Sequence, residues 1–374
     1  MYKLECPIAE SAWRDIAEPP VLSIVVPTFN RTGELVVAVS SIAGQLVGGL
    51  ERKVEIIISD NASEPATVEV IKALFERFPT VSYLIHARDE GGFFQFFAAP
   101  WRARGRWTWV FGSDDAVTGG GIAHVVDLLE REQPGFMTLN KQVANSSLTH
   151  VLSASANHVP DRRFDTYIDL FCALGINQFA FISGNIERTE AARAIDARYY
   201  FAAETRHSHL AAYLEKHAKA PAYYCSANNL VHRTDNSQMI EYNSGNFFDY
   251  GVTLPCVLTE VAARIGAPVD LLERISGDKA IESYDAPNLT YVDMMFENIL
   301  RAIAFGKYMT LAHRYKLERI LDACRPHRRA QFLEIWTRHQ HLLSLESASA
   351  RAKSVLDLEQ QAALQASQAF ARLP

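Results

Sequence analysis

The chain has 374 residues, of which 48% are hydrophobic and 21% are charged, with a formal net charge of −6. This length suits one large or two ordinary domains, and the composition is typical of a globular protein and not of a disordered one. The acidic balance argues against a nucleic-acid binder, which normally carries a basic excess.

Cysteine usage and the N-terminal residues indicate the cellular compartment. The chain has five cysteines, scattered and without a CxxC pair, and an odd count does not suggest a disulfide framework. The first residues lack the basic and apolar regions of a signal peptide, and no apolar run reaches the roughly 18 residues of a membrane span. These features predict a protein of the reducing cytoplasm.

The first third of the chain alternates between strand and helix patterns. Apolar runs typical of strands buried on both faces occur at 21–26, 54–59 and 81–85, and from Trp107 onwards. Apolar residues at helical spacing follow at 35–46, 70–78 and about 93–104. This alternation with short links predicts a mostly parallel sheet with helices on both faces.

The rest of the chain is less regular, and the pattern becomes helical beyond about residue 235. We expect helices at 122–129, 164–174, 189–197 and 204–217. We expect strands at 136–140, 179–183, 222–225 and 230–232, and an irregular hairpin or loop over 141–160. The sequence therefore predicts an α/β domain over residues 1–235 and a mostly helical C-terminal region over 236–374.

Two adjacent acids, Asp114 and Asp115, follow the predicted strand that starts at Trp107. Ligands of open α/β sheets bind at the carboxyl ends of the strands. Neighbouring carboxylates repel each other unless a cation lies nearby, and Mg²⁺ or Mn²⁺ bridging to a phosphate is the simplest candidate. The alternative is a solvated turn that caps the next helix.

Three strand-end loops together resemble a known family. The segments VVPTFNR at 25–31, IIISDNAS at 56–63 and FGSDD at 111–115 are similar to the motifs of family 2 glycosyltransferases with the GT-A fold. The resemblance covers roughly residues 20–130 well and 131–235 loosely. It implies a Rossmann-like, mostly parallel GT-A domain, a nucleotide-diphosphate sugar as the donor, and a saccharide or lipid-linked saccharide as the acceptor.

The resemblance assigns the donor-binding residues. Pro27, Thr28, Asn30 and Arg31 would surround the nucleotide, and Asp60 would accept a hydrogen bond from a pyrimidine N–H.

The paired acids match a DXD-type motif in which Ser113 replaces the first acid. Asp115 would bind Mn²⁺ or Mg²⁺, and Asp114, counted among the catalytic residues, would bind the ribose or the donor sugar. Among nearby arginines, Arg88 has the best case for contacting the diphosphate, because it directly follows the third predicted strand.

The catalytic base is less clear from the resemblance. An inverting transfer needs a group that removes the acceptor proton, and the family usually supplies an acid in an ED-like pair. The matching region, 201–209, has no clean ED pair, so Glu204 and His207 are both candidates. The alternative role for Glu204 is that of an acidic residue at a helix N-terminus, with no part in catalysis. The base and the stereochemistry therefore stay open. By the resemblance the segment Ser183-Gly184-Asn185 lies near the acceptor, with a simple turn as the alternative.

The leading hypothesis is a metal-dependent, inverting glycosyltransferase of surface polysaccharide biosynthesis. The alternatives are a catalytically degenerate GT-A scaffold and a nucleotidyltransferase, although the first loop lacks the glycines of the latter. The C-terminal helices have three alternatives: packing on the catalytic domain, forming a homodimer, or lying on the inner face of the membrane.

Overall fold

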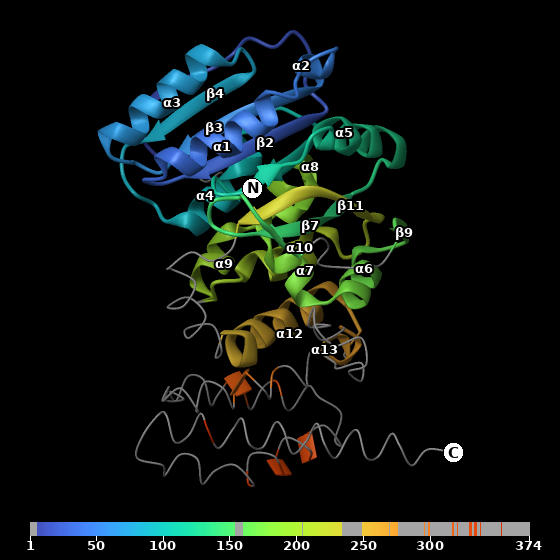
Figure 1. Cartoon of the computed structure of the whole chain (residues 1–374). Helices are drawn as coiled ribbons and strands as arrows, with labels where there is room; N and C mark the ends of the chain where they lie inside the picture. The colour runs from blue at the N-terminus through green and yellow to red at the C-terminus, as the bar shows by residue number, and fades with distance from the viewer. Residues whose placement is uncertain are drawn as a thin grey trace. The chain divides into compact units, whose positions relative to one another are not determined.

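The computed structural model describes residues 6–153, 160–203, 205–233, 249–268 and 270–275, together with a few isolated residues further along the chain (Figure 1). These residues form two compact units. The first comprises the described residues up to 203 and residues 208–233, and the second comprises 205–207 and the described residues from 249 onwards. The predicted division between residues 235 and 236 lies in a stretch outside the described residues.

The first unit is built on one sheet of eleven strands. These strands are β1 (Ile8–Ala12), β2 (Leu22–Thr28), β3 (Val54–Asp60), β4 (Val81–His86), β5 (Trp107–Val110), β6 (Ala116–Val117), β7 (Phe136–Ala144), β8 (Val151–Ser153), β9 (Arg162–Phe164), β10 (Asn185–Arg188) and β11 (Ala222–Arg233). Their order is β1-β4-β3-β2-β5-β10-β7-β11-β6, with β8 beside β7 and β9 beside β11.

The strands β4, β3, β2 and β5 are parallel to one another. Thr28 at the end of β2 is paired with Asp60 at the end of β3, and Val25 of β2 is paired with Val110 of β5. The polar segments that follow these strands therefore leave the sheet along the same edge. This confirms the predicted α/β class with a mostly parallel centre.

Helices cover both faces of this parallel centre (Figure 1). The helices of the first unit are α1 (Thr32–Ala43), α2 (Leu50–Lys53), α3 (Pro65–Arg77), α4 (Gly92–Arg102), α5 (Gly121–Glu132), α6 (Tyr167–Leu174), α7 (Ile176–Ala180), α8 (Thr189–Arg193), α9 (Ala197–Ala202) and α10 (Ser208–His217). On one face, Leu35 of α1, Ile71 of α3 and Val125 of α5 belong to the same core as Ile24 and Ile56 of the sheet. On the other face, α4 contacts β2, β3 and β5.

The prediction of a strand at 179–183 is wrong. This segment forms the end of α7 and a 3₁₀ turn, η1 (Ile182–Gly184), and the strand β10 comes directly after it. Phe179 is buried against the rings of Phe136, Tyr167 and Phe171. A short apolar run is compatible with either a buried helix or a strand, and this aromatic cluster buries it as a helix.

The N-terminal segment and β11 also differ from the expected elements. The N-terminal segment, for which no strand was predicted, contributes β1, which pairs antiparallel with β4. The two short strands expected at 222–225 and 230–232 are one strand, β11, whose register against β7 is irregular between Cys225 and Leu230. The irregularity explains why the pattern looked like two strands.

In the second unit, a π-helical turn, η2 (Asp249–Thr253), leads into α12 (Leu254–Ile265), which is followed by α13 (Leu271–Arg274). These helices lie in the region beyond about residue 235 where the sequence predicts helical structure. None of the helices among the residues that the structure describes is long and apolar enough to cross a membrane.

Candidate functional site

The loops after β2 and β3 are held together by hydrogen bonds. The backbone N–H of Asn30 donates to Ser63 Oγ at 2.8 Å, and the N–H of Glu64 donates to Asn30 Oδ1 at 2.8 Å. The N–H of Asn61 donates to the carbonyl oxygen of Thr28 at 2.9 Å. Asn30 has a φ of 52°, in the left-handed region that asparagine tolerates better than most residues. These bonds join the two loops into one structure.

Asp60 lies within this structure and is completely buried. Its Oδ2 accepts a hydrogen bond from the N–H of Ser63 at 2.9 Å, whereas its Oδ1 is buried without a hydrogen-bond partner among the described residues. Burial raises the pKa of the Asp60 carboxyl, against the lowering effect of the bonds from Ser63. Thr28 Oγ1 is likewise buried without a partner. Because an unpaired buried acceptor is costly, these atoms indicate a position where a ligand donates hydrogen bonds.

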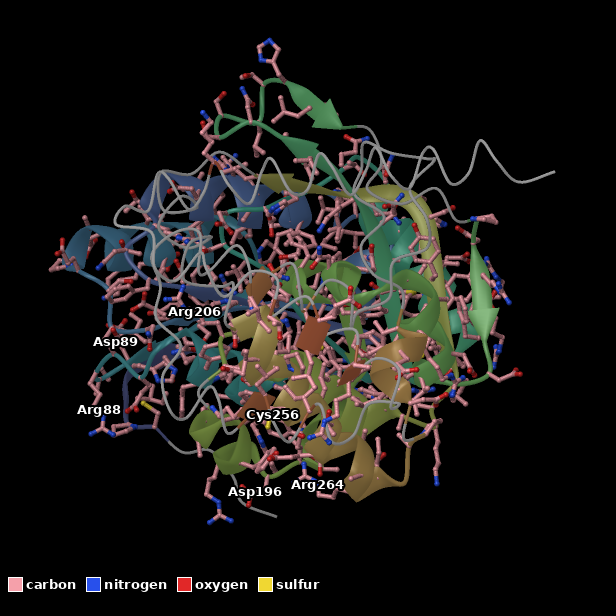
Figure 2. All side chains as sticks on the ribbon, turned by 90° about the horizontal axis from the view of Figure 1, so that it is seen from below. Arg88, Asp89, Asp196, Arg206, Cys256 and Arg264 are labelled. Atoms are coloured by element: carbon pink, nitrogen blue, oxygen red, sulfur yellow. The ribbon has the colours of Figure 1, made fainter. Side chains whose placement is uncertain are left out.

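The loop after β4 is fixed to the same structure through Asn61. Asn61 Oδ1 accepts from the N–H of Glu90 at 3.0 Å and from Gln95 Nε2 at 2.9 Å. Arg88 in this loop is 71% exposed and pairs with Glu90 at 2.5 Å. Figure 2 shows Arg88 and Asp89 together at the periphery of the view. In this structure, the arginine paired with the acids after β5 is Arg31 and not Arg88.

A compact turn follows β5 and carries the two acids. Arg31 Nη1 lies 2.6 Å from Asp114 Oδ2. Ser183 Oγ donates to Asp115 Oδ2 at 2.6 Å and accepts from the N–H of Gly112 at 2.8 Å. A Cβ atom on Gly112 would lie 2.9 Å from Asp115 Oδ2 and 3.0 Å from Asp114 Oδ1. Glycine at position 112 therefore lets the turn close tightly around both carboxylates.

The end of β11 completes this cluster, and the sequence did not identify its residues. His232 Nδ1 lies 3.2 Å from Asp115 Oδ1, and the N–H of Arg233 donates to the same oxygen at 3.2 Å. Arg233 Nε also donates to the carbonyl oxygen of Asp114 at 2.7 Å. The sequence placed His232 at the end of the last predicted strand, but no neighbouring motif connected this residue with Asp115.

The charges of this cluster are only partly balanced. The pKa of the Asp114 carboxyl is raised by burial and by the neighbouring charge of Asp115, and the guanidinium of Arg31 opposes this rise. No group of three His, Cys, Asp or Glu side chains arranged to hold a metal occurs among the described residues. Asp115 Oδ1 and His232 Nδ1 nevertheless provide two adjacent ligands of types that suit Mn²⁺, with diphosphate oxygens and water able to complete the shell. The residues present therefore fit a metal that is shared with a phosphorylated ligand.

His207, one of the two candidate bases, belongs to the second unit. It is buried, with Nδ1 2.8 Å from Asp249 Oδ2 and Nε2 3.0 Å from the hydroxyl of Tyr250. The N–H of Arg206, which Figure 2 labels, donates to Asp249 Oδ2 at 3.1 Å. A carboxylate on Nδ1 fixes the proton there and leaves the Nε2 lone pair as an acceptor. The other candidate, Glu204, lies outside the described residues.

Residues 23–183 match the family model described as Glycosyl transferase family 2. This range contains the loops after β2, β3 and β5 and ends at Ser183, the partner of Asp115. The chain therefore carries a family 2 glycosyltransferase domain with the GT-A fold, which confirms the family predicted from its motifs.

Two comparisons name individual relatives. The chain is 28% identical over 186 residues to abequosyltransferase RfbV of Salmonella typhimurium, an alignment that covers 47% of this chain and 55% of RfbV. The chain thus spans about half the length of this curated relative. Its fold is similar to that of S. aureus TarS 1–349 in complex with UDP-GlcNAc, with a TM-score of 0.53 and 11% identity over 91% of this chain and 92% of that one. A second structure of TarS 1–349 gives a TM-score of 0.50 at 10% identity, over 91% of both chains.

Proposed function

We propose that this protein transfers a sugar from a nucleotide-diphosphate sugar to a hydroxyl group of a saccharide or glycolipid acceptor. The observation that carries this proposal is the buried, unpaired Oδ1 of Asp60 at the same sheet edge as Asp114 and Asp115. Asp60 Oδ1 can accept a hydrogen bond from the nucleobase, and the two acids can bind the sugar-phosphate part. These two groups therefore match the two ends of such a donor. The match to the glycosyltransferase family supports the same conclusion.

The nucleotide base is assigned to the loops after β2 and β3. Asp60 Oδ1 accepts the N–H of a pyrimidine, and the buried position makes the bond selective because a base without that donor would leave the carboxylate unpaired. The ring of Phe29, 44% exposed in the same loop, offers a flat apolar face to the base. Pro27, Thr28 and Asn30 complete this loop. A pyrimidine nucleotide is also the one named in the complex of the structural neighbour TarS.

The diphosphate and the adjoining sugars are assigned to the turn after β5. Asp114 accepts from hydroxyl groups of the ribose or donor sugar, and Asp115 with His232 would hold Mn²⁺ or Mg²⁺. When bound, the metal neutralises the charge that develops on the diphosphate leaving group. Ser183 and the backbone of Arg233 fix the orientation of the Asp115 carboxylate. Arg88 stays a proposed contact for the diphosphate, in exchange for its bond to Glu90.

Sugar transfer requires a general base that removes the proton of the acceptor hydroxyl. We propose His207, with Asp249 holding the proton on Nδ1 so that Nε2 accepts, and keep Glu204 as the second candidate. An inverting reaction fits a single base and a leaving diphosphate. If His207 is the base, His207→Ala slows transfer far more than it weakens donor binding, while Glu204→Gln leaves the rate near that of the wild type. Wild-type rates in both variants would place the base elsewhere.

The biological setting is proposed from the relatives. Abequosyltransferase RfbV is by its name a sugar transferase, and the sequence motifs resemble those of enzymes of surface polysaccharide assembly. We propose the same setting for this protein.

The test of the proposed function is a thermal-shift panel of UDP, CDP, dTDP and GDP, each with and without Mn²⁺. The expected result is a rise in Tm with one pyrimidine diphosphate that is larger when Mn²⁺ is present. No rise with any of the four nucleotides would contradict the assignment, and a rise with GDP alone would contradict the role of Asp60.

A further inference from the structure

The ion pair between Arg31 and Asp114 joins two residues that both face the proposed donor. Arg31 Nη1 lies 2.6 Å from Asp114 Oδ2, and the two side chains are 36% and 23% exposed. A pair that is open to solvent on this scale is weak, and it can be exchanged for another partner at little cost.

The backbone beneath Arg31 is fixed, which limits how this residue can move. The preceding residue, Asn30, is bonded through its N–H to Ser63 and through its side chain to Glu64. A change of partner for Arg31 therefore involves its side-chain rotamer and not a movement of the loop.

The other arginine at this turn is not available for such an exchange. Arg233 Nε donates to the carbonyl oxygen of Asp114, and its Nη1 donates to the carbonyl oxygen of Ser146 at 2.5 Å. Its guanidinium therefore links two backbone segments. The guanidinium of Arg31 is paired instead with the carboxylate that a ribose hydroxyl would need as its acceptor.

We propose that Arg31 leaves Asp114 for the diphosphate when the donor binds, and that this exchange makes the site selective for a nucleoside diphosphate over the bare nucleoside. The proposal rests on the proposed function of this site. A guanidinium binds phosphate oxygens through two parallel N–H bonds, so the diphosphate competes well for it. The same movement frees Asp114 Oδ2 to accept from the ribose. A bare nucleoside offers Arg31 no anion in return for its lost partner.

The experiment measures Kd for UDP and for uridine by calorimetry on the full chain in buffer with Mn²⁺, or for CDP and cytidine if CDP gives the larger thermal shift. The quantity of interest is the ratio of the nucleoside Kd to the diphosphate Kd. In Arg31→Met this ratio is expected to fall about tenfold or more, with the uridine Kd unchanged or lower. Arg31→Lys keeps the charge but not the paired N–H bonds, so its ratio is expected between those of wild type and Arg31→Met.

A matched control is Arg131→Met on α5. Arg131 is also an exposed arginine, 54% accessible and paired with Asp127 at 2.6 Å, but it lies outside the site. Its ratio is expected to equal that of the wild type. Thermal denaturation of each variant checks that the fold is retained.

A second variant tests the exchange itself. Asp114→Asn releases Arg31 from its partner, so the ratio is expected to rise above the wild-type value. Removing a negative charge near the diphosphate would also raise the ratio, but that effect persists when Arg31 is absent. The double variant Arg31→Met with Asp114→Asn separates the two causes, because the exchange predicts that most of the rise disappears in it.

Two results would overturn the exchange while leaving the proposed function in place. The first is an unchanged ratio in Arg31→Met, including the case in which UDP and uridine are weakened equally, and the second is a full rise in the double variant. If the wild type bound none of the four nucleoside diphosphates of the thermal-shift panel, the proposed function would fail and the role of Arg31 with it.

Discussion

Ser183 donates a hydrogen bond of 2.6 Å to Asp115 across 68 positions of sequence, and the same hydroxyl accepts from the N–H of Gly112. The 3₁₀ turn before β10 therefore holds the acid that follows β5. The carbonyl oxygen of Ser183 also accepts from the indole N–H of the buried Trp109 at 2.7 Å. The position of the Asp115 carboxylate thus depends on contacts that close around one small residue, Gly112.

Gly112→Ala is expected to lower kcat/KM at least tenfold while changing Tm little. The added methyl group would contact both carboxylates and the Ser183 hydroxyl, at 2.9–3.1 Å from the Cβ atom. A displacement of these charged groups by a few tenths of an ångström lowers the rate of transfer. Each tenfold loss in rate corresponds to roughly 1.4 kcal/mol of transition-state stabilisation. Steady-state kinetics of sugar transfer measure this effect.

Gly119→Ala is the control, because no atom lies within 4 Å of its added Cβ. If both glycine variants had wild-type kinetics, the close packing around Gly112 would have no functional role.

Asp60→Asn is expected to abolish nucleotide binding without loss of stability. Burial raises the pKa of Asp60, so the folded state holds its proton more tightly than the unfolded state does. The stabilising effect of the protonated form is complete at low pH and is lost as the pH rises through the raised pKa. At pH 7 the charged Asp60 therefore destabilises the fold, and Asn is expected to keep or raise Tm, by about 2–4 °C for each kcal/mol gained.

Thermal denaturation at pH 7 and pH 4.5 tests this expectation. The advantage of Asn over Asp should shrink at the lower pH. A large fall in Tm of Asp60→Asn at pH 7 would show that Asp60 serves the fold, and not a ligand.

His86→Gln is expected to reduce the loss of stability in mild acid. His86 Nε2 accepts from Arg102 Nη2 at 2.6 Å, which leaves the ring proton on Nδ1, 2.9 Å from Cys6 Sγ. Burial, and then the charge of Arg102, lower the pKa of His86 to about 4. Since the unfolded state takes up this proton near pH 6.5, stability falls as the pH drops from about 7 towards 4.

Between pH 7 and pH 5 this linkage amounts to about 2 kcal/mol of unfolding free energy. Urea denaturation of wild type and His86→Gln at both pH values measures it. Parallel losses in the two proteins would show that other groups control the acid sensitivity.

Asp115→Asn and His232→Gln are both expected to remove the Mn²⁺-dependent part of the thermal shift with the nucleoside diphosphate. Each substitution keeps a polar group of similar size but removes a metal ligand. Asp115→Asn is preferable to Asp115→Ala, because alanine would leave the hydroxyl of Ser183 and the N–H of Arg233 without their acceptor.

Turnover of Asp115→Asn is expected to fall about a hundredfold or more at saturating Mn²⁺. Treating the wild type with EDTA should give a similar loss. An Mn²⁺-dependent shift that survives in both variants would place the metal elsewhere.

The parts of the site that sequence predicts are those with a local signal. An apolar strand ending in Asp60 or in Asp114–Asp115 is visible within ten residues, and parallel strands bring their ends to one edge. His232 and Arg233 had no such signal, since they reach Asp115 only through the pairing of β11 with β7 and β6. Among the nearby arginines, the sequence favoured Arg88 because it directly follows a predicted strand, whereas in the structure it is Arg31 that pairs with Asp114. That pairing depends on side-chain geometry that spacing does not contain.

The antiparallel strand β10 shows the same limit at the level of the fold. It lies between β5 and β7 and carries the sheet from one half of the domain to the other. Only the tertiary packing of Phe179 distinguishes the helix before it from the strand that the apolar run suggested.

The bonds from Asn30 to Ser63 and Glu64 also have a consequence for protein engineering. The loops after β2 and β3 come from different βα units, yet neither can change its shape without losing hydrogen bonds to the other. A designer who wished to alter the choice of nucleotide would therefore have to transplant residues 27–31 and 59–64 as a single cassette. The same dependence would act on natural variation, which would be expected to exchange these two segments in concert.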